Sequence, residues 1–384
     1  MSVGAGGVGR AMGVVGVSLL VGGCAPLGDD LYPKPDDLSP EWQLDRVRVL
    51  AIRAEPPEID LGQSSVLEGL VVDPYGDVAL KVWNACPPDE DGGGDFGCIA
   101  DLPTDGLSPD SLDLDALRDA GILAIEPIPG FSSPTYTPTC SDIRWPDRCT
   151  DNPTGCSDPS LDLAACCDQI GLAACPQLEK LYSLIQVAAI PGDALAPREP
   201  ADPDAPPQET FDFNDVEVAF KRLVVSASPT PNTNPALARF HVDGLVVHDE
   251  DTVVEVDAGQ TYTILAVLAD DAAQDYTYVP SSCREPGDPP VPDACADPAL
   301  QDPSDECAPQ CRAEEPYVKW YATGGVVREP TTLFGFLDTT WTAPSTDDPV
   351  LVTEGDVWAV SRDRRGGIAW RRLRWRLRAL ADAP

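Results

Sequence analysis

Apolar and charged residues alternate with a period of two near the end of the chain. The arginines are Arg372, Arg374, Arg376 and Arg378, and the residues between them are Leu373, Trp375 and Leu377. A half-buried β-strand has this period, because successive side chains point to opposite faces. We expect the apolar face to point into a core and the arginines to point to solvent. An alternative is that the arginines bind an acidic partner or the protein's own acidic surface.

The same alternation predicts several other short strands. They lie at residues 216–220, 253–256, 317–321 and 357–360. A succession of short strands separated by turn residues is typical of antiparallel β folds.

One strand pattern occurs twice in the chain. Residues 58–73 read EIDLGQSSVLEGLVVD and residues 255–270 read EVDAGQTYTILAVLAD. Both segments predict a strand, a tight turn at Gly62 or Gly259, and a second strand that alternates between two faces. An internal repeat of this kind indicates two related domains.

A tryptophan follows each copy of the repeat. Leu80-Lys81-Val82-Trp83 follows the first, and Val318-Lys319-Trp320 follows the second. We expect Trp83 and Trp320 to lie on central strands and to face the two cores.

A third segment resembles a known class of domains. The run from Trp358 to Gly367, WAVSRDRRGG, resembles the penultimate strand and the D-x-x-G-G turn of bacterial immunoglobulin-like and PKD-type modules. The resemblance covers residues 216–384 and, less closely, residues 45–85. It implies a mainly β protein with two Ig-like antiparallel β-sandwich domains, and it implies no particular activity.

The expected organisation has four parts. Residues 1–23 form a signal peptide, residues 24–44 a tether rich in Pro and Asp, residues 45–215 the first Ig-like domain, and residues 216–384 the second. Each domain carries a Cys-rich insertion, at 86–180 in the first and at 271–316 in the second. We expect a few short helices in these disulfide-stapled insertions.

The N-terminus has the parts of a bacterial export signal. Arg10 is followed by an apolar run over residues 11–21 that is too short to cross a bilayer. The segment ends in Val21-Gly22-Gly23-Cys24, which resembles the lipobox of bacterial lipoproteins. The resemblance implies lipid on Cys24, and Ala25 after it implies placement in the outer membrane.

The cysteines agree with export. Thirteen are present, and twelve remain when Cys24 is set aside. They fall into three groups, each with an even number: Cys86 and Cys98; Cys140, Cys149, Cys156, Cys166, Cys167 and Cys175; Cys283, Cys295, Cys307 and Cys311. We expect disulfides within each group, as is usual in an oxidising compartment, although the pairing cannot be deduced. The absence of any CxxC pair argues against zinc.

The charge balance limits the partners. The formal net charge is −38, which argues against nucleic acid as a partner, because phosphate binding needs clustered Lys and Arg. Acidic loops can bind calcium, and Asp89, Asp91 and Asp95 in a Gly-rich loop are candidate ligands. The alternative is a solvated acidic turn with no cofactor.

No catalytic motif is present. The sequence contains no G-x-S-x-G, and its two histidines, His241 and His248, lie in a strand-like segment. We therefore expect a non-enzymatic adhesion, binding or scaffolding module with a protein or glycan partner at the cell surface. The alternatives are a hydrolase acting on extracellular polymer and a subunit of an envelope assembly.

Overall fold

The structure is a computed structural model. It describes residues 40–60, 62–74, 78–86, 122–126, 134–139, 142, 181–191, 216–226, 228, 230–283, 291–348 and 352–378. The signal, Cys24, the acidic loop with Asp89, Asp91 and Asp95, and most of the first insertion lie outside these residues. None of the helices in the described ranges is long and apolar enough to cross a membrane.

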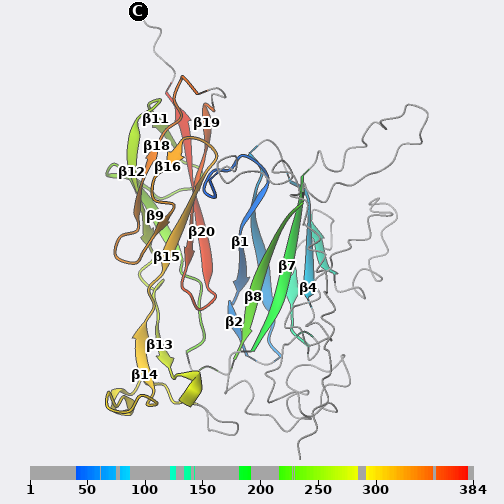
Figure 1. The fold of residues 1–384 in the computed structure, drawn as a ribbon, viewed down its shortest axis with the longest axis vertical. Helices are drawn as coiled ribbons and strands as arrows, with labels where there is room; N and C mark the ends of the chain where they lie inside the picture. The colour runs from blue at the N-terminus through cyan, green and yellow to red at the C-terminus, as the bar shows by residue number, and fades with distance from the viewer. Residues whose placement is uncertain are drawn as a thin grey trace, which may run out of the picture. The chain divides into compact units, whose positions relative to one another are not determined.

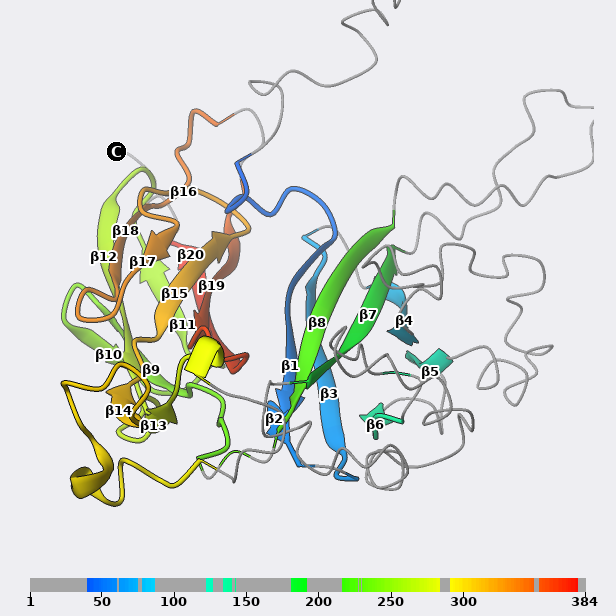
Figure 2. The same ribbon diagram turned by 60° about the horizontal axis from the view of Figure 1, so that its bottom comes forward.

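Two β-sandwiches account for nearly all the described strands. In the first sandwich, one sheet has the order β1-β3-β6 and the other the order β2-β8-β7-β4-β5. These strands are β1 (Arg48–Glu55), β2 (Glu58–Ile59), β3 (Ser65–Val72), β4 (Val78–Cys86), β5 (Ile122–Glu126), β6 (Thr135–Tyr136), β7 (Leu181–Pro191) and β8 (Glu217–Val225). Figure 2 shows β1 beside β3 and β8 beside β7.

The second sandwich repeats this topology. Its sheets have the orders β10-β9-β12-β18-β16 and β11-β20-β19-β15-β17. The strands are β9 (Leu237–Val242), β10 (Leu245–Val247), β11 (Val253–Val256), β12 (Thr261–Leu268), β15 (Tyr317–Ala322), β16 (Val326–Val327), β17 (Thr331–Thr332), β18 (Asp338–Thr342), β19 (Glu354–Arg362) and β20 (Ile368–Leu377). In both sandwiches a short strand of the repeat, β2 or β11, pairs in parallel with the last strand, β8 or β20.

The repeat forms the predicted strand, turn and strand in both copies. Gly62 has φ 73° and Gly259 has φ 69°, a conformation that glycine adopts without the steric cost of a Cβ. The chain then enters β3 or β12. Within each strand, the alternation of apolar and polar residues decides which face is buried.

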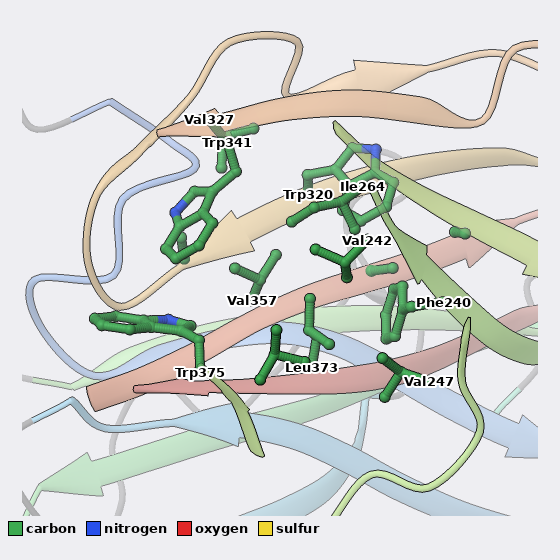
Figure 3. Packing of buried hydrophobic residues seen from close by; sticks show 14 of the residues in the cluster. Phe240, Val242, Val247, Ile264, Trp320, Val327, Trp341, Val357, Leu373 and Trp375 are labelled. Atoms are coloured by element: carbon green, nitrogen blue, oxygen red, sulfur yellow. The ribbon is translucent and has the colours of Figure 1, made fainter. Parts of the chain in front are cut away.

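The two predicted core tryptophans are fully buried. Trp83 lies on β4 and Trp320 on β15, and each strand is next to the edge of its sheet. Figure 3 shows Trp320 and Phe240 in the second core, where Trp341 and Trp375 lie together. The Trp341 and Trp375 ring centroids are 5.3 Å apart.

One expected domain boundary is wrong. The expected boundary puts residues 216–220 in the second domain, whereas β8 pairs along its length with β7 of the first sandwich. The period of a strand shows which residues are buried but not which strand is its neighbour. The range expected to be an insertion, 86–180, also contains two strands of the first sandwich, β5 and β6.

The end of the expected tether is part of the folded unit. The Leu44 amide donates to the Ala322 carbonyl at 2.9 Å, and the Ala322 amide donates to the Trp42 carbonyl at 2.9 Å. Leu44 is buried. Residues 42–44 therefore pair in parallel with the end of β15, at Ala322.

The second insertion is stapled as expected. It forms the hairpin of β13 (Asp275–Tyr278) and β14 (Gln310–Ala313), which lies beyond the end of the second sandwich (Figure 1). Its two disulfides join Cys283 to Cys307 and Cys295 to Cys311. The described part of the insertion also holds two short 3-10 helices, Ser281–Cys283 and Pro298–Leu300. Cys86 is disulfide-bonded too. The remaining cysteine groups stay predictions.

Candidate binding surface

Three features of the described residues could carry a function: a buried charge network between the sandwiches, an acidic cleft, and an exposed apolar loop. The first two lie where the sandwiches meet. An apolar cluster joins the sandwiches there. It contains Leu50, Ala51, Leu70 and Val72 of the first sandwich, Tyr321, Val360 and Ile368 of the second, and Leu44 from the segment that pairs with β15.

Arg365 is the centre of the buried charge network. Its guanidinium lies 3.2 Å from a Glu58 oxygen and 2.7 Å from a Glu314 oxygen. The side chains are nearly inaccessible, with 8% of Arg365 and 1% of each glutamate exposed. Arg365 also donates to the Thr230 carbonyl at 2.8 Å and lies over the ring of Tyr276. Removing one partner of such a group would leave a buried charge unpaired.

The D-x-x-G-G turn holds Arg365 in place. One Asp363 oxygen accepts the amides of Arg365, Gly366 and Gly367 at 2.7, 2.9 and 2.9 Å. A Cβ on Gly367 would lie 2.0 Å from the other Asp363 oxygen, so the position needs glycine. The turn that the sequence showed therefore has a structural role where the two sandwiches meet, a region called the junction below.

Burial shifts the pKa values of two titratable groups of this region, Glu314 of the network and Lys221. Burial raises the pKa of the Glu314 carboxyl above its usual value, against the opposing effect of Arg365. Burial lowers the pKa of Lys221 to about 8. Lys221 donates to the Gly366 carbonyl, which links β8 to the turn between β19 and β20.

The cleft lies beside the apolar contact between the sandwiches and has a volume of about 550 Å³. Its acidic lining residues are Asp45, Asp73, Asp348, Glu354 and Asp356. Burial raises the pKa of Asp356, while Arg372 and Arg374 oppose the rise. Glu354 pairs with Arg376 at 3.1 Å. Within the described ranges, no three His, Cys, Asp or Glu side chains are placed to hold a metal ion.

The arginine stripe of β20 meets the protein's own acidic residues. Besides the Arg376 pair, Arg378 pairs with Asp257 at 3.0 Å and Arg372 lies 3.7 Å from Asp251. Leu373 and Trp375 face the core, as their alternation with the arginines predicts. Arg376 and Arg378 are 53% and 57% exposed, so the arginine face points to solvent as expected, and its ion pairs with the protein's own acidic residues lie on the surface.

The third feature is the loop Leu333–Phe336, called here the apolar loop. Leu333 is 57% exposed, Phe334 47% and Phe336 79%. No motif in the sequence led us to expect it. The signal that could have found it is a run without charge, TTLFGFL over residues 331–337, in a chain where 23% of residues are charged.

The apolar loop is fixed at both ends. Before it, the Thr332 hydroxyl accepts a hydrogen bond from the Trp320 indole at 2.9 Å. After it, the buried Leu337 accepts the Ala266 amide at 3.1 Å. Within the loop, the Phe336 amide donates to the Leu333 carbonyl at 2.9 Å. The apolar side chains are therefore displayed on an ordered turn.

The two histidines have structural contacts. The Arg239 guanidinium donates to His241 Nε2 at 3.2 Å, and the His248 carbonyl accepts from Arg371. Neither contact joins a serine or cysteine to a histidine base.

Comparison with known proteins does not identify a family. No family model and no curated protein matches the chain. Among solved structures, the tandem V-type regions of VCBP3, a v-region-containing chitin binding protein, match 86% of this chain and 100% of that one, with 13% identity and a TM-score of 0.25. Dimeric latent PorU from Porphyromonas gingivalis matches 91% of this chain and 25% of its own, with 9% identity and a TM-score of 0.16. Neither likeness is close enough to assign a function.

Proposed function

We propose that the chain is an exported, lipid-anchored envelope protein that acts as a non-enzymatic binding module. The observation that carries the binding role is the apolar loop, and the anchor rests on the sequence around Cys24. Large apolar side chains grouped on an ordered, exposed turn cost solubility and usually mark an interaction site. Loops displayed on a rigid β-sandwich are a common place for recognition.

The framework behind the apolar loop suits binding. The loop is anchored next to Trp320, in the core of a sandwich that is itself joined to its neighbour by apolar contacts and a buried ion network. A loop that is already ordered loses little conformational entropy when it binds.

A photo-crosslinking residue placed at Phe336 of the full chain tests the proposal in cells. We expect labelling of a partner from this position, and we expect Leu333→Ser with Phe334→Ser to abolish it. The same residue at Phe220, which is 55% exposed on β8, is the matched control. Equal labelling from both positions would count against a binding role for the loop.

The anchor is tested separately. Cys24→Ser should move the protein from the membrane fraction to the soluble fraction, and the intact mass should lose its acyl groups. A wild-type chain without acyl mass would contradict the anchor and leave the binding role open.

A hydrolase is the second candidate, and the cleft is the observation that favours it. A carboxyl whose pKa is raised by burial, such as that of Asp356, has the property needed in a general acid. Release of reducing ends from envelope polysaccharide, lost in Asp356→Asn, would replace the binding proposal with this one.

A further inference from the structure

We propose that the apolar loop inserts into the interface of a lipid bilayer, next to the point where the lipid-linked segment enters the fold. This inference rests on the proposed function, because it takes the anchor at Cys24 as the reason why a membrane is near. It names the partner of the loop as a lipid surface.

The chemistry of the loop suits a lipid interface. Its exposed side chains, those of Leu333, Phe334 and Phe336, contain carbon and hydrogen only. They offer no hydrogen bond to a polar partner. Phe and Leu are the side chains with which peripheral proteins enter the boundary between headgroups and acyl chains.

Two backbone hydrogen bonds made within the protein hold the shape of the apolar loop and of the residue that follows it. The amide of Phe336 is bonded to the carbonyl of Leu333, and the carbonyl of Leu337 is bonded to the amide of Ala266. These bonded amide and carbonyl groups do not oppose transfer from water to lipid.

The start of the folded chain lies beside the loop. Glu41 forms an ion pair with Lys319 of β15 at 2.8 Å. Lys319 is paired in register with Thr331 of β17, and the apolar loop begins two residues after Thr331. Glu41, the first residue of the folded unit, and the apolar loop therefore lie at the same edge of the second sandwich.

The intervening segment is short enough to keep the loop near the membrane. Sixteen residues separate Cys24 from Glu41, and a chain of that length spans at most about 55 Å. An anchor at this distance gives the loop a high effective concentration of lipid, so that a weak interaction suffices.

Charge predicts the kind of lipid. The chain has a net charge of −38, and Glu329 and Asp338 lie on either side of the loop. Anionic headgroups would be repelled by such a protein. The expected surface is zwitterionic, and binding should depend little on salt.

The test uses the full lipidated chain carrying Phe336→Trp, in phosphatidylcholine vesicles with and without bromine on the acyl chains. The emission that this substitution adds should fall about twofold in brominated lipid, since bromine quenches only an indole that enters the bilayer interface. Phe220→Trp is the matched control and should not be quenched. Equal emission from Phe336→Trp in both kinds of vesicle would overturn the inference.

The full Cys24→Ser chain separates this inference from the proposed function. With excess vesicles, Phe336→Trp in that chain should still be quenched, which would support the loop contact even if wild-type protein carried no lipid. A third outcome is possible: the wild-type chain carries lipid, Phe336→Trp is not quenched, and the crosslinker at Phe336 labels a protein. That result would contradict the lipid contact and support the binding module.

Discussion

Glu58 and Glu255 hold the same place in the two copies of the repeat, yet their surroundings are opposite. Both begin the shared motif, and both lie on a strand that pairs in parallel with the last strand of its sandwich, Glu58 with Val224 and Glu255 with Arg376. Glu58 is 2% exposed, whereas Glu255 lies in solvent. The same local fold thus supports a buried charge in one copy and a surface charge in the other.

The difference comes from the neighbouring sandwich. Glu58 accepts the Asn232 amide at 2.9 Å and the Ser226 hydroxyl, and it pairs with Arg365 from the turn after β19. A buried carboxylate needs several such partners to offset the loss of water. The repeat therefore determines the strand and the turn, and the contacts between the sandwiches determine whether the glutamate is buried and paired.

The largest expected effect tests what the two copies share. Trp83→Ala and Trp320→Ala should each lower the free energy of unfolding by about 3–5 kcal/mol, because each removes a fully buried indole from a core. The Trp83 indole also donates to Glu126 at 3.1 Å. Urea unfolding of the full chain measures both losses. A loss confined to one variant would show that the two cores are not equivalent.

The next effect tests where the copies differ. Glu58→Ala should destabilise the protein by about 3 kcal/mol, because it removes one of the two carboxylates that pair with the buried Arg365. Glu255→Ala, the matched control, should change stability by less than about 0.5 kcal/mol. Urea midpoints that shift equally in the two variants would contradict a special role for the junction.

A third comparison uses pH. Glu58 pairs with Val224 and Glu255 with Arg376, so Lys221 and Leu373 each lie three residues before the partner of the glutamate. The pKa of Lys221 is lowered from 10.5 to about 8, so between these values the unfolded chain binds a proton that the folded chain has lost. Below pH 8, Lys221 is charged in both states, and its burial lowers the free energy of unfolding by the full amount. Above about pH 8 the folded chain loses the proton first, so the free energy of unfolding rises with pH.

The variant Lys221→Leu should lack this dependence. Relative to this variant, the free energy of unfolding of the wild type should rise by about 2 kcal/mol between pH 7.5 and pH 10. Urea unfolding at several pH values in this range measures the difference. Parallel pH curves for the two proteins would mean that Lys221 stays charged and well paired.

The smallest expected effect tests the turns. Gly62→Ala and Gly259→Ala should each cost about 1 kcal/mol, since both positions have positive φ and a Cβ would meet no atom within 4 Å. Thermal unfolding should show two similar shifts. A much larger shift at Gly62 would show that the junction, and not the backbone alone, constrains that turn.

The strands, the two turns and the two buried tryptophans could be predicted from the sequence. Each follows from a local property: a period of two, a glycine between strands, and a large apolar ring on an alternating segment. The disulfides at Cys283–Cys307 and Cys295–Cys311 were predicted as a group but not as pairs, because connectivity depends on how the hairpin of β13 and β14 folds.

The partner of β8, the burial of Glu58 and the exposure of the apolar loop were decided only by the tertiary structure. Alternation in residues 216–220 is the same whether the strand joins one sheet or another, which is why the boundary was misplaced. The apolar run from Leu333 to Phe336 does not itself show whether it is buried; in the structure it lies between the end of β17 at Thr332 and the start of β18 at Asp338. Burial and exposure belong to the packing of distant segments, whereas strand and turn patterns are local to the chain.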